Sequence, residues 1–412
     1  MFEYKSLNKV VNDKQARVIV DLLLQEGEAR FVGGCIRDAI IGRDFSDIDI
    51  ATDIVPEGVL TLLKNNGISA IATGLAHGTV TAVIDKRNFE ITTLRKDVNC
   101  DGRRAEVEFT TDWKEDALRR DFTMNAMSLD VNGEIYDYFG GIDDLKNGVV
   151  KFVGNADERI KEDYLRILRL FRFYAFYGKA PISKEHLQVC KENISGIESL
   201  SGERISIEMK KMFLSKNIIS VLTMMNDYNL LYIIFGNVIK SFNFSVLSKI
   251  INLKDDYNSM LVFAAIMADS NLDVNAVNLV MNRWKLSNSD KEYVRRIMFP
   301  IYPIKSSFDD SELRKSIRRN GKNYFPDVAL MQLCKEIVDG ADSKIIKQKF
   351  EEFLQVESEW KIPQLPLKGV DIINLGIKEG KEIGDTLRRA ENYWEGKNYT
   401  ANKDDIITYL EI

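Results

Sequence analysis

The clearest constraint on the fold is a change of pattern near residue 150. Before that point, short runs of alternating polar and apolar residues mix with stretches of helical spacing. From about residue 157 onward there is almost no strand signal, and long helical patterns cover 203–214, 217–235 and 259–269. The sequence therefore predicts an α+β fold, with a small mixed sheet and helices first and an all-helical remainder after it.

Composition narrows the class of protein. The chain has 412 residues, of which 45% are hydrophobic and 29% charged, which excludes a fibrous or largely disordered protein. The longest uninterrupted apolar stretch, 260–268, is far short of the roughly 20 residues that span a bilayer, so no membrane association is expected. The first residues match neither a secretory nor a transit signal. The four cysteines contain no C-x-x-C pair, so we expect a reduced, cytoplasmic protein.

Charge and histidine content exclude further classes. The net charge of −5 argues against indiscriminate coating of nucleic acid, and no DNA partner is expected. Residues 1–150 hold 18 basic and 26 acidic side chains, whereas the rest of the chain carries a small positive excess. An acidic front part suits a site for divalent cations, although chance variation of surface charge explains it equally well. With only two histidines, a metallohydrolase domain built on a histidine cluster is excluded.

The front part contains a recognisable series of short elements. The patterns predict helices at 15–28 and 37–41, strands at 29–32 and 46–51, and a hairpin of 78–84 with 88–94 around residues 85–87.

Two aspartates carry the first chemical signal. Asp47 and Asp49 alternate along the expected strand at 46–51, so their carboxylates share one face. The two carboxylates repel each other unless a cation lies between them, and their hard oxygen atoms are ligands that suit Mg²⁺. Glu90, in the middle of the next hairpin, is the candidate third carboxylate. A solvated surface pair is the ordinary explanation of an isolated D-x-D.

A glycine pair strengthens the metal hypothesis. Gly33 and Gly34 fall between a strand and a helix, where backbone N–H groups can approach phosphate oxygens, and Arg37 follows in the first turn. This arrangement can hold a triphosphate over two metal ions. The corresponding chemistry is an in-line displacement of pyrophosphate that needs no histidine base.

Five motifs together resemble those of class II tRNA nucleotidyltransferases, the CCA-adding enzymes of the polymerase-β-like superfamily. They are residues 31–38 (FVGGCIRD) with 47–53 (DIDIATD), 119–126 (RRDFTMNA), 137–145 (DYFGGIDDL), 162–166 (EDYLR) and 203–205 (ERI). The resemblance implies a nucleotidyltransferase head at 1–150, a helical neck at 151–215, a helical body at 216–360 and a tRNA-binding tail at 361–412. It also implies two Mg²⁺ ions and the substrates CTP and ATP.

The fourth motif is expected to select the base. Residues 162–173 are predicted to form one helix, on which Asp163, Arg166, Arg169 and Arg172 make a polar stripe. Cytosine and adenine both present an amino donor beside a ring-nitrogen acceptor, which a carboxylate and a guanidinium complement. By resemblance, Asp163 and Arg166 are this protein template, and Arg169 and Arg172 face the triphosphate or the base. An ion-paired, solvated helix face is the alternative.

The resemblance also implies roles for two further segments of the head. Arg120 and Asn125 are expected to contact the nucleotide at its phosphates or sugar; pairing of Arg120 with Asp116 or Asp121 is the alternative. Residues 95–108 lack clear periodicity and correspond to the family's flexible loop, which is needed to switch from C to A addition. An ordinary surface loop is the alternative there.

The helical remainder must bind the RNA. The most basic cluster has four cations at helical spacing, Arg314, Lys315, Arg318 and Arg319. Residues 366–384 resemble the family's tail, with glycine-punctuated helix ends that can offer N–H groups to phosphates. We expect these regions to hold the tRNA acceptor stem and elbow by shape and charge, and solvated helix faces are the alternative.

The expected activity is therefore the addition of CCA to tRNA 3′ ends from CTP and ATP, without a nucleic-acid template and with release of pyrophosphate. Three alternatives stay open at this point. A bacterial poly(A) polymerase has nearly the same head motifs, but usually also basic extensions that a chain with net charge −5 lacks. Enzymes that add only CC or only A, and a catalytically inactive RNA-binding scaffold, are the others.

Overall fold

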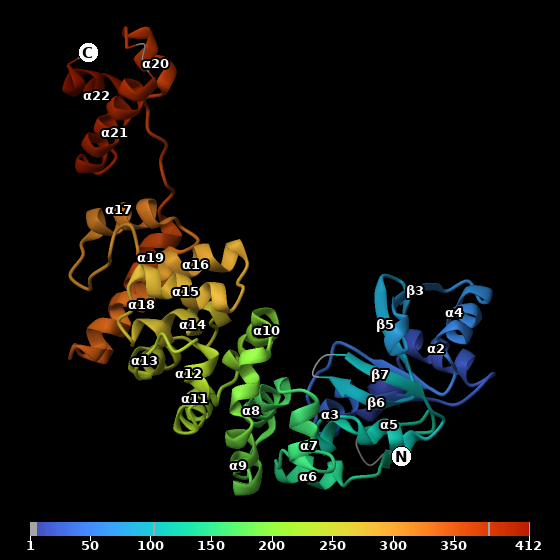
Figure 1. Ribbon diagram of the computed structural model, residues 1–412. Helices are drawn as coiled ribbons and strands as arrows, with labels where there is room; N and C mark the ends of the chain where they lie inside the picture. Colours follow the sequence, from blue (N-terminus) through green and yellow to red (C-terminus); the bar gives the residue numbers. More distant parts are fainter. Residues whose placement is uncertain (1–5, 102–103, 378–379, 412) are drawn as a thin grey trace. The chain divides into compact units, whose positions relative to one another are not determined.

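The structure is a computed structural model that describes residues 6–101, 104–377 and 380–411. The chain forms two compact units, Met1–Asn237 and Val238–Ile412 (Figure 1). The last described strand ends at Asp137, and every regular element described after it is a helix. This confirms the expected α+β head and helical remainder. No described helix is long and apolar enough to cross a membrane.

A seven-stranded mixed sheet organises the first unit. Its strand order is β3-β4-β5-β2-β1-β8-β9, and the pair β2–β5 is its parallel pair. The strands are β1 Ala29–Val32, β2 Asp49–Thr52, β3 Ser69–Gly74, β4 Thr79–Ile84, β5 Arg87–Thr93, β8 Met127–Leu129 and β9 Ile135–Asp137. Phe31, Ile50, Phe89 and Ile91 point into its core, with at most 1% of each exposed. Burial of each such side chain is worth about 2–3 kcal/mol.

The predicted hairpin is confirmed. β4 and β5 pair antiparallel from Thr79↔Thr92 to Ile84↔Arg87. The turn residues Asp85 and Lys86 have positive φ angles of 49° and 66°, the conformation of a tight two-residue hairpin turn. The predicted strand at 29–32 is β1, but the strand expected at 46–51 begins only at Asp49.

Residues 95–108 are not a loop without regular structure. β6 Arg95–Asp101 and β7 Arg104–Phe109 form a separate two-stranded antiparallel sheet. A register shift between Asp97 and Asn99 interrupts the pairing, and this irregularity explains why the sequence shows no clean alternation. Residues 102–103, between these two strands, lie outside the described residues.

The helices of the first unit precede, cover and follow the sheet. They are α1 Leu7–Val11, α2 Lys14–Leu23, α3 Gly34–Ile40, α4 Pro56–Asn65, α5 Trp113–Leu118, α6 Gly141–Asn147, α7 Ala156–Glu162, α8 Leu165–Tyr177, α9 Lys184–Glu192, α10 Gly202–Phe213, α11 Ile218–Asp227 and α12 Leu230–Ile234, with single 3₁₀ turns at Leu75–His77, Thr123–Asn125 and Ile194–Ser199.

Two predicted helices are each broken in two. The pattern at 217–235 divides into α11 and α12 at Asn229, whose φ is 61°. The prediction of one helix over 162–173 is wrong at its start, because α7 ends at Glu162 and α8 begins only at Leu165. Asp163 lies between them in extended backbone, and its carboxylate accepts a hydrogen bond of 3.1 Å from the Leu165 amide. An aspartate bonded in this way favours a helix start over continuation.

The second unit is helical throughout its described part. Its helices are α13 Ser245–Leu253, α14 Ser259–Ala268, α15 Val274–Arg283, α16 Asn288–Met298, α17 Asp310–Asn320, α18 Phe325–Val338, α19 Ser343–Glu359, α20 Gly369–Asn374, α21 Gly380–Gly396 and α22 Lys403–Leu410. The apolar stretch at 260–268 is α14, which is buried on all sides and forms the centre of this unit. Leu367, Ile372, Trp394 and Ile406 belong to a separate small core around α20–α22.

Candidate active site

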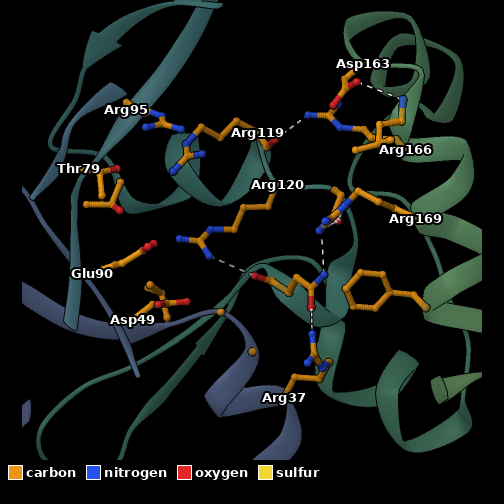
Figure 2. A pocket seen from close by; sticks show the side chains of 18 of the residues that line it. Arg37, Asp49, Thr79, Glu90, Arg95, Arg119, Arg120, Asp163, Arg166 and Arg169 are labelled. Atoms are coloured by element: carbon orange, nitrogen blue, oxygen red, sulfur yellow. Dashed lines mark hydrogen bonds and ion pairs between the residues drawn. The ribbon is translucent and has the colours of Figure 1, made fainter. Parts of the chain in front are cut away.

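A polar pocket of about 630 Å³ opens in the first unit (Figure 2). Ten of the residues proposed from sequence line it: Gly33, Gly34, Arg37, Asp49, Glu90, Arg120, Asn125, Asp163, Arg166 and Arg169. Asp47 and Arg172 do not line it, and the basic cluster at 314–319 belongs to the second unit. Seven arginines and four carboxylates line the pocket, a net charge of +3 that suits an anionic ligand.

The carboxylates Asp49 and Glu90 lie together at one end of the pocket (Figure 2). The parallel pairing of β2 and β5 places Ile50 opposite Ile91, so the residues just before them stand side by side. Burial, together with the negative charge of Glu90, raises the pKa of Asp49 to about 6. A group that is this costly to ionise is stabilised by a cation between the two carboxylates.

Asp47 is placed differently from the expectation. It lies two residues before Asp49 but outside β2, and its side chain is exposed. Its charge still acts on Asp49, whose pKa it raises. Among the described residues, no three His, Cys, Asp or Glu side chains are gathered as a ready-made metal site. The oxygen donors of Asp49 and its two acidic neighbours fit Mg²⁺ in chemistry and in charge.

The glycine at the start of α3 is required by the geometry. Gly33 precedes the helix with φ 80° and ψ −138°, a conformation that residues with a side chain rarely adopt. A Cβ atom there would also lie 3.3 Å from Oδ2 of Asp49. Gly33 thus lets the backbone pass directly beside the carboxylate.

Arg37 points into the pocket from α3 and is held on three sides. Its guanidinium donates to Asp38 at 2.8 and 3.0 Å and to Oδ1 of Asn125 at 2.7 Å. It also lies over the Tyr177 ring, 4.5 Å from the centroid. These contacts fix the position of a cation that the sequence placed beside the glycines.

Arg119 and Arg120 share one buried carboxylate. Asp116 is 3% exposed; it accepts from Nε of Arg119 at 2.8 Å and from Nη2 of Arg120 at 3.1 Å. Burial alone raises the pKa of Asp116, but the charges of Arg120 and Arg119 outweigh it and hold that pKa below its ordinary value. Arg120 therefore makes the pairing that was its alternative explanation and lines the pocket as well.

The two proposed base-reading residues come from opposite sides of the helix break. Asp163 accepts from Arg204 of α10 at 2.7 Å. Arg166 donates to Glu162 at 2.5 Å and to the Arg159 carbonyl at 2.7 Å. Both face the pocket at the end away from Asp49 and Glu90 (Figure 2). The pair is thus ordered by neighbouring groups.

The next two arginines of α8 have different positions. Arg169 lines the pocket and donates through Nε to Asp121 at 2.7 Å, and Asp121 also accepts from Nδ2 of Asn125 at 2.9 Å. Arg172 pairs instead with Glu208 of α10 at 2.6 Å, and Glu208 is 6% exposed in its side chain. The structure therefore connects Arg172 to the packing of α8 on α10 and not to the pocket.

Sequence reasoning did not assign nine lining residues to the site: Val32, Thr79, Thr92, Arg95, Arg119, Asp121, Leu165, Phe173 and Arg204. Arg119, Asp121 and Arg204 lie within the quoted motifs, so the signal for them was present. Arg95 and Thr79 come from strand ends whose convergence depends on the sheet order, and a local pattern does not contain that information.

The comparisons with known proteins agree with this geometry. A model of the poly(A) polymerase head domain matches residues 29–151, and one described as the probable RNA- and SrmB-binding site of polymerase A matches residues 181–240. The fold and the site thus define a nucleotidyltransferase. The chain belongs to the class II CCA-adding tRNA nucleotidyltransferases, as the relatives described next show.

Two relatives carry the family assignment. The CCA-adding enzyme of Staphylococcus haemolyticus is 31% identical over 414 residues, covering 96% of this chain and 97% of the relative. The human mitochondrial CCA tRNA nucleotidyltransferase 1 is 35% identical over 398 residues, covering 95% of this chain and 89% of the relative. The expected family is thereby confirmed.

Solved structures show the same fold. The Bacillus stearothermophilus CCA-adding enzyme in complex with CTP matches with a TM-score of 0.78 at 23% identity, over 99% of this chain and 97% of that chain. The Thermotoga maritima CCA-adding enzyme complexed with tRNA matches with a TM-score of 0.63 at 20% identity, over 99% and 97%.

Proposed function

We propose that the chain adds C, C and A to tRNA 3′ ends, transferring CMP and AMP from CTP and ATP and releasing pyrophosphate. One observation carries this: a single pocket has Asp49 and Glu90 at one end and Asp163 with Arg166 at the other (Figure 2). Arginines line the space between them. A nucleotide fits this polarity with its triphosphate near the carboxylates and its base near Asp163.

Asp47 and Asp49 are the proposed ligands of two Mg²⁺ ions, with Glu90 as a further carboxylate. The raised pKa of Asp49 supports this, because burial and the nearby negative charges make a cation favourable. When bound, Mg²⁺ lowers the pKa of the attacking hydroxyl and stabilises the leaving pyrophosphate. Gly33 and Gly34 give the phosphates access to backbone N–H groups, and Arg37, Arg120 and Asn125 are the proposed phosphate and sugar contacts.

Asp163 and Arg166 are the proposed readers of the base. Asp163 accepts from the exocyclic amino group, and Arg166 donates to the ring nitrogen, so that C and A fit where U and G leave buried charges without partners. Arg169 approaches from the next turn of α8. For Arg172, contact with the nucleotide is no longer proposed, since Glu208 holds it away from the pocket.

The division into a head at 1–150, a neck at 151–215, a body at 216–360 and a tail at 361–412 remains our proposal for how the chain engages tRNA. The proposed location is the cytoplasm. Cys35, Cys190 and Cys334 support it, because all three are buried free thiols, as expected in a reducing compartment.

Incubation of tRNA lacking its last three nucleotides with labelled CTP, ATP or both tests the proposed function. Addition of two nucleotides with CTP alone and of three with both supports it. A long ladder of A indicates a poly(A) polymerase instead. Arrest at two nucleotides with both substrates indicates a CC-adding enzyme, and growth only on tRNA ending in CC indicates an A-adding enzyme.

A further inference from the structure

A second cavity of about 300 Å³ lies within the first unit. Its cations are Arg43 and Lys179, and its apolar wall includes Ile41, Leu145, Phe176 and Tyr177. None of the described residues that line it is acidic. A cavity with two cations and aromatic side chains has the composition of a site for a phosphorylated aromatic ligand.

Both cations are on exposed residues, and neither forms an ion pair with a described side chain. Arg43 donates to the Phe176 carbonyl at 2.8 Å and lies 4.8 Å from the Tyr177 ring centroid, but forms no ion pair with a described residue. The Lys179 ammonium likewise has no ion-pair or hydrogen-bond partner in the described part of the chain. An anionic group can therefore reach both cations from solvent.

Neighbouring aromatic residues of α8 connect the walls of the two cavities. Phe173 lines the active-site pocket, and Tyr177, one helical turn further on, lines the second cavity. Their rings stack with centroids 5.7 Å apart. Tyr177 also donates to Asp38 at 2.8 Å, and Asp38 holds Arg37 in the active-site pocket.

We propose that this cavity is a second nucleotide-phosphate site, with the phosphate at Arg43 and Lys179 and the base against Phe176 and Tyr177. The shared chemistry is that of a nucleoside phosphate. It has two possible sources, a free nucleotide and a nucleotide of an RNA chain that continues out of the active site. The site itself is independent of the proposed function, because binding is measured without turnover.

Equilibrium dialysis of the full-length protein with labelled AMP tests the free-nucleotide source. Lys179→Gln removes the charge but keeps the Cβ and Cγ atoms that lie close to Gly148. Lys191→Gln, at an exposed lysine of α9 that does not line the cavity, is the matched control. We expect one of two bound AMP molecules to weaken by tenfold or more in Lys179→Gln, and no change in Lys191→Gln.

A second arm tests the RNA source. The affinity for tRNA lacking CCA is measured against salt for the same variants, together with Arg43→Gln. If the occupant is an RNA nucleotide, AMP stoichiometry is unchanged, while tRNA binding weakens and its salt slope decreases by about 0.7–0.9 in Lys179→Gln. Equal AMP and tRNA binding by Lys179→Gln and Lys191→Gln overturns the site. The CCA-addition assay is read separately, so its failure does not decide this result.

Discussion

Arg169 of α8 donates two hydrogen bonds to the same carboxylate oxygen of Asp121, one of them from Nε at 2.7 Å. Asp121 is buried and comes from the second motif, 48 residues earlier in the chain. Its other oxygen accepts from Asn125, which in turn accepts from Arg37. This single carboxylate therefore connects the cation beside the glycines with the helix proposed to read the base.

The first prediction concerns Asp121→Asn. The change keeps the side-chain size but removes the negative charge, so that the longer ion pair with Glu208, at 3.6 Å, remains for Arg169. Removing one partner of a buried ion pair costs about 3–5 kcal/mol, and we expect the lower part of this range because Glu208 remains. Urea unfolding measures the loss. Asp143→Asn, at an exposed residue of α6, is the control and should unfold like the unchanged protein.

The second prediction is a pH dependence of stability. Burial alone raises the pKa of Asp121, but the charge of Arg169 outweighs it and holds that pKa below 3.8. A depressed pKa contributes stability above the ordinary value, and this stability is lost as the pH falls through the folded value. The free energy of unfolding should therefore drop below about pH 4, and less steeply in Asp121→Asn. A slope unchanged by the substitution contradicts the assignment.

The third prediction separates the carboxylates of the proposed metal site. Asp49→Asn and Asp47→Asn should each reduce nucleotide incorporation by several orders of magnitude, because a neutral amide binds Mg²⁺ poorly. Binding of tRNA should persist in both. Glu57→Gln, an exposed residue at the start of α4, keeps full activity as the control. Full activity of Asp47→Asn would remove this exposed residue from the metal site.

The fourth prediction concerns base selection. Asp163→Ala should raise incorporation of UTP relative to CTP, or abolish activity, because the carboxylate acceptor is gone. Arg204→Gln releases Asp163 from its ion pair and should shift the CTP to UTP ratio in the same direction by a smaller factor. Lys161→Gln, at an exposed residue of α7, is the control. An unchanged ratio in Asp163→Ala excludes the role of base reader.

The fifth prediction distinguishes two roles of the basic cluster. Arg319 donates to the buried Glu395 of α21 at 2.8 Å, and Arg318 pairs with Glu391 and lies 5.2 Å from the Trp394 ring. If these arginines act by holding α21, Glu395→Gln should weaken tRNA binding as much as Arg319→Gln does. If they contact phosphates, Arg319→Gln alone should lower the salt slope.

A filter-binding assay across salt concentrations separates these outcomes. Glu382→Gln, exposed in the first turn of α21, is the matched control for the loss of a negative charge. Arg314, by contrast, makes its one side-chain hydrogen bond within the described part of the chain to Asn398, at 3.5 Å, and Lys315 is half-buried. Both remain proposed RNA contacts.

Local patterns predicted most of the head. The alternation at 78–94 gave the hairpin, because a sheet face that is buried on one side imposes a period of two. The break at Asp163 was missed, since residues 162–173 keep helical spacing on both sides of it. The ion pairs of Arg169 with Asp121 and of Arg172 with Glu208 were not predicted either, because the two partners of each pair lie far apart in the chain.

The interruption between α7 and α8 has a consequence for how nucleotide preference can be altered. The ring of Tyr164, next to Asp163, lies so close to Gly196 that a Cβ atom there would approach it to 2.1 Å. A methyl group at Gly196 would thus displace the joint that carries one member of the reading pair while α8 kept the other. If Asp163 and Arg166 read the base, nucleotide preference should therefore respond to substitution of Gly196, a residue that does not line the pocket.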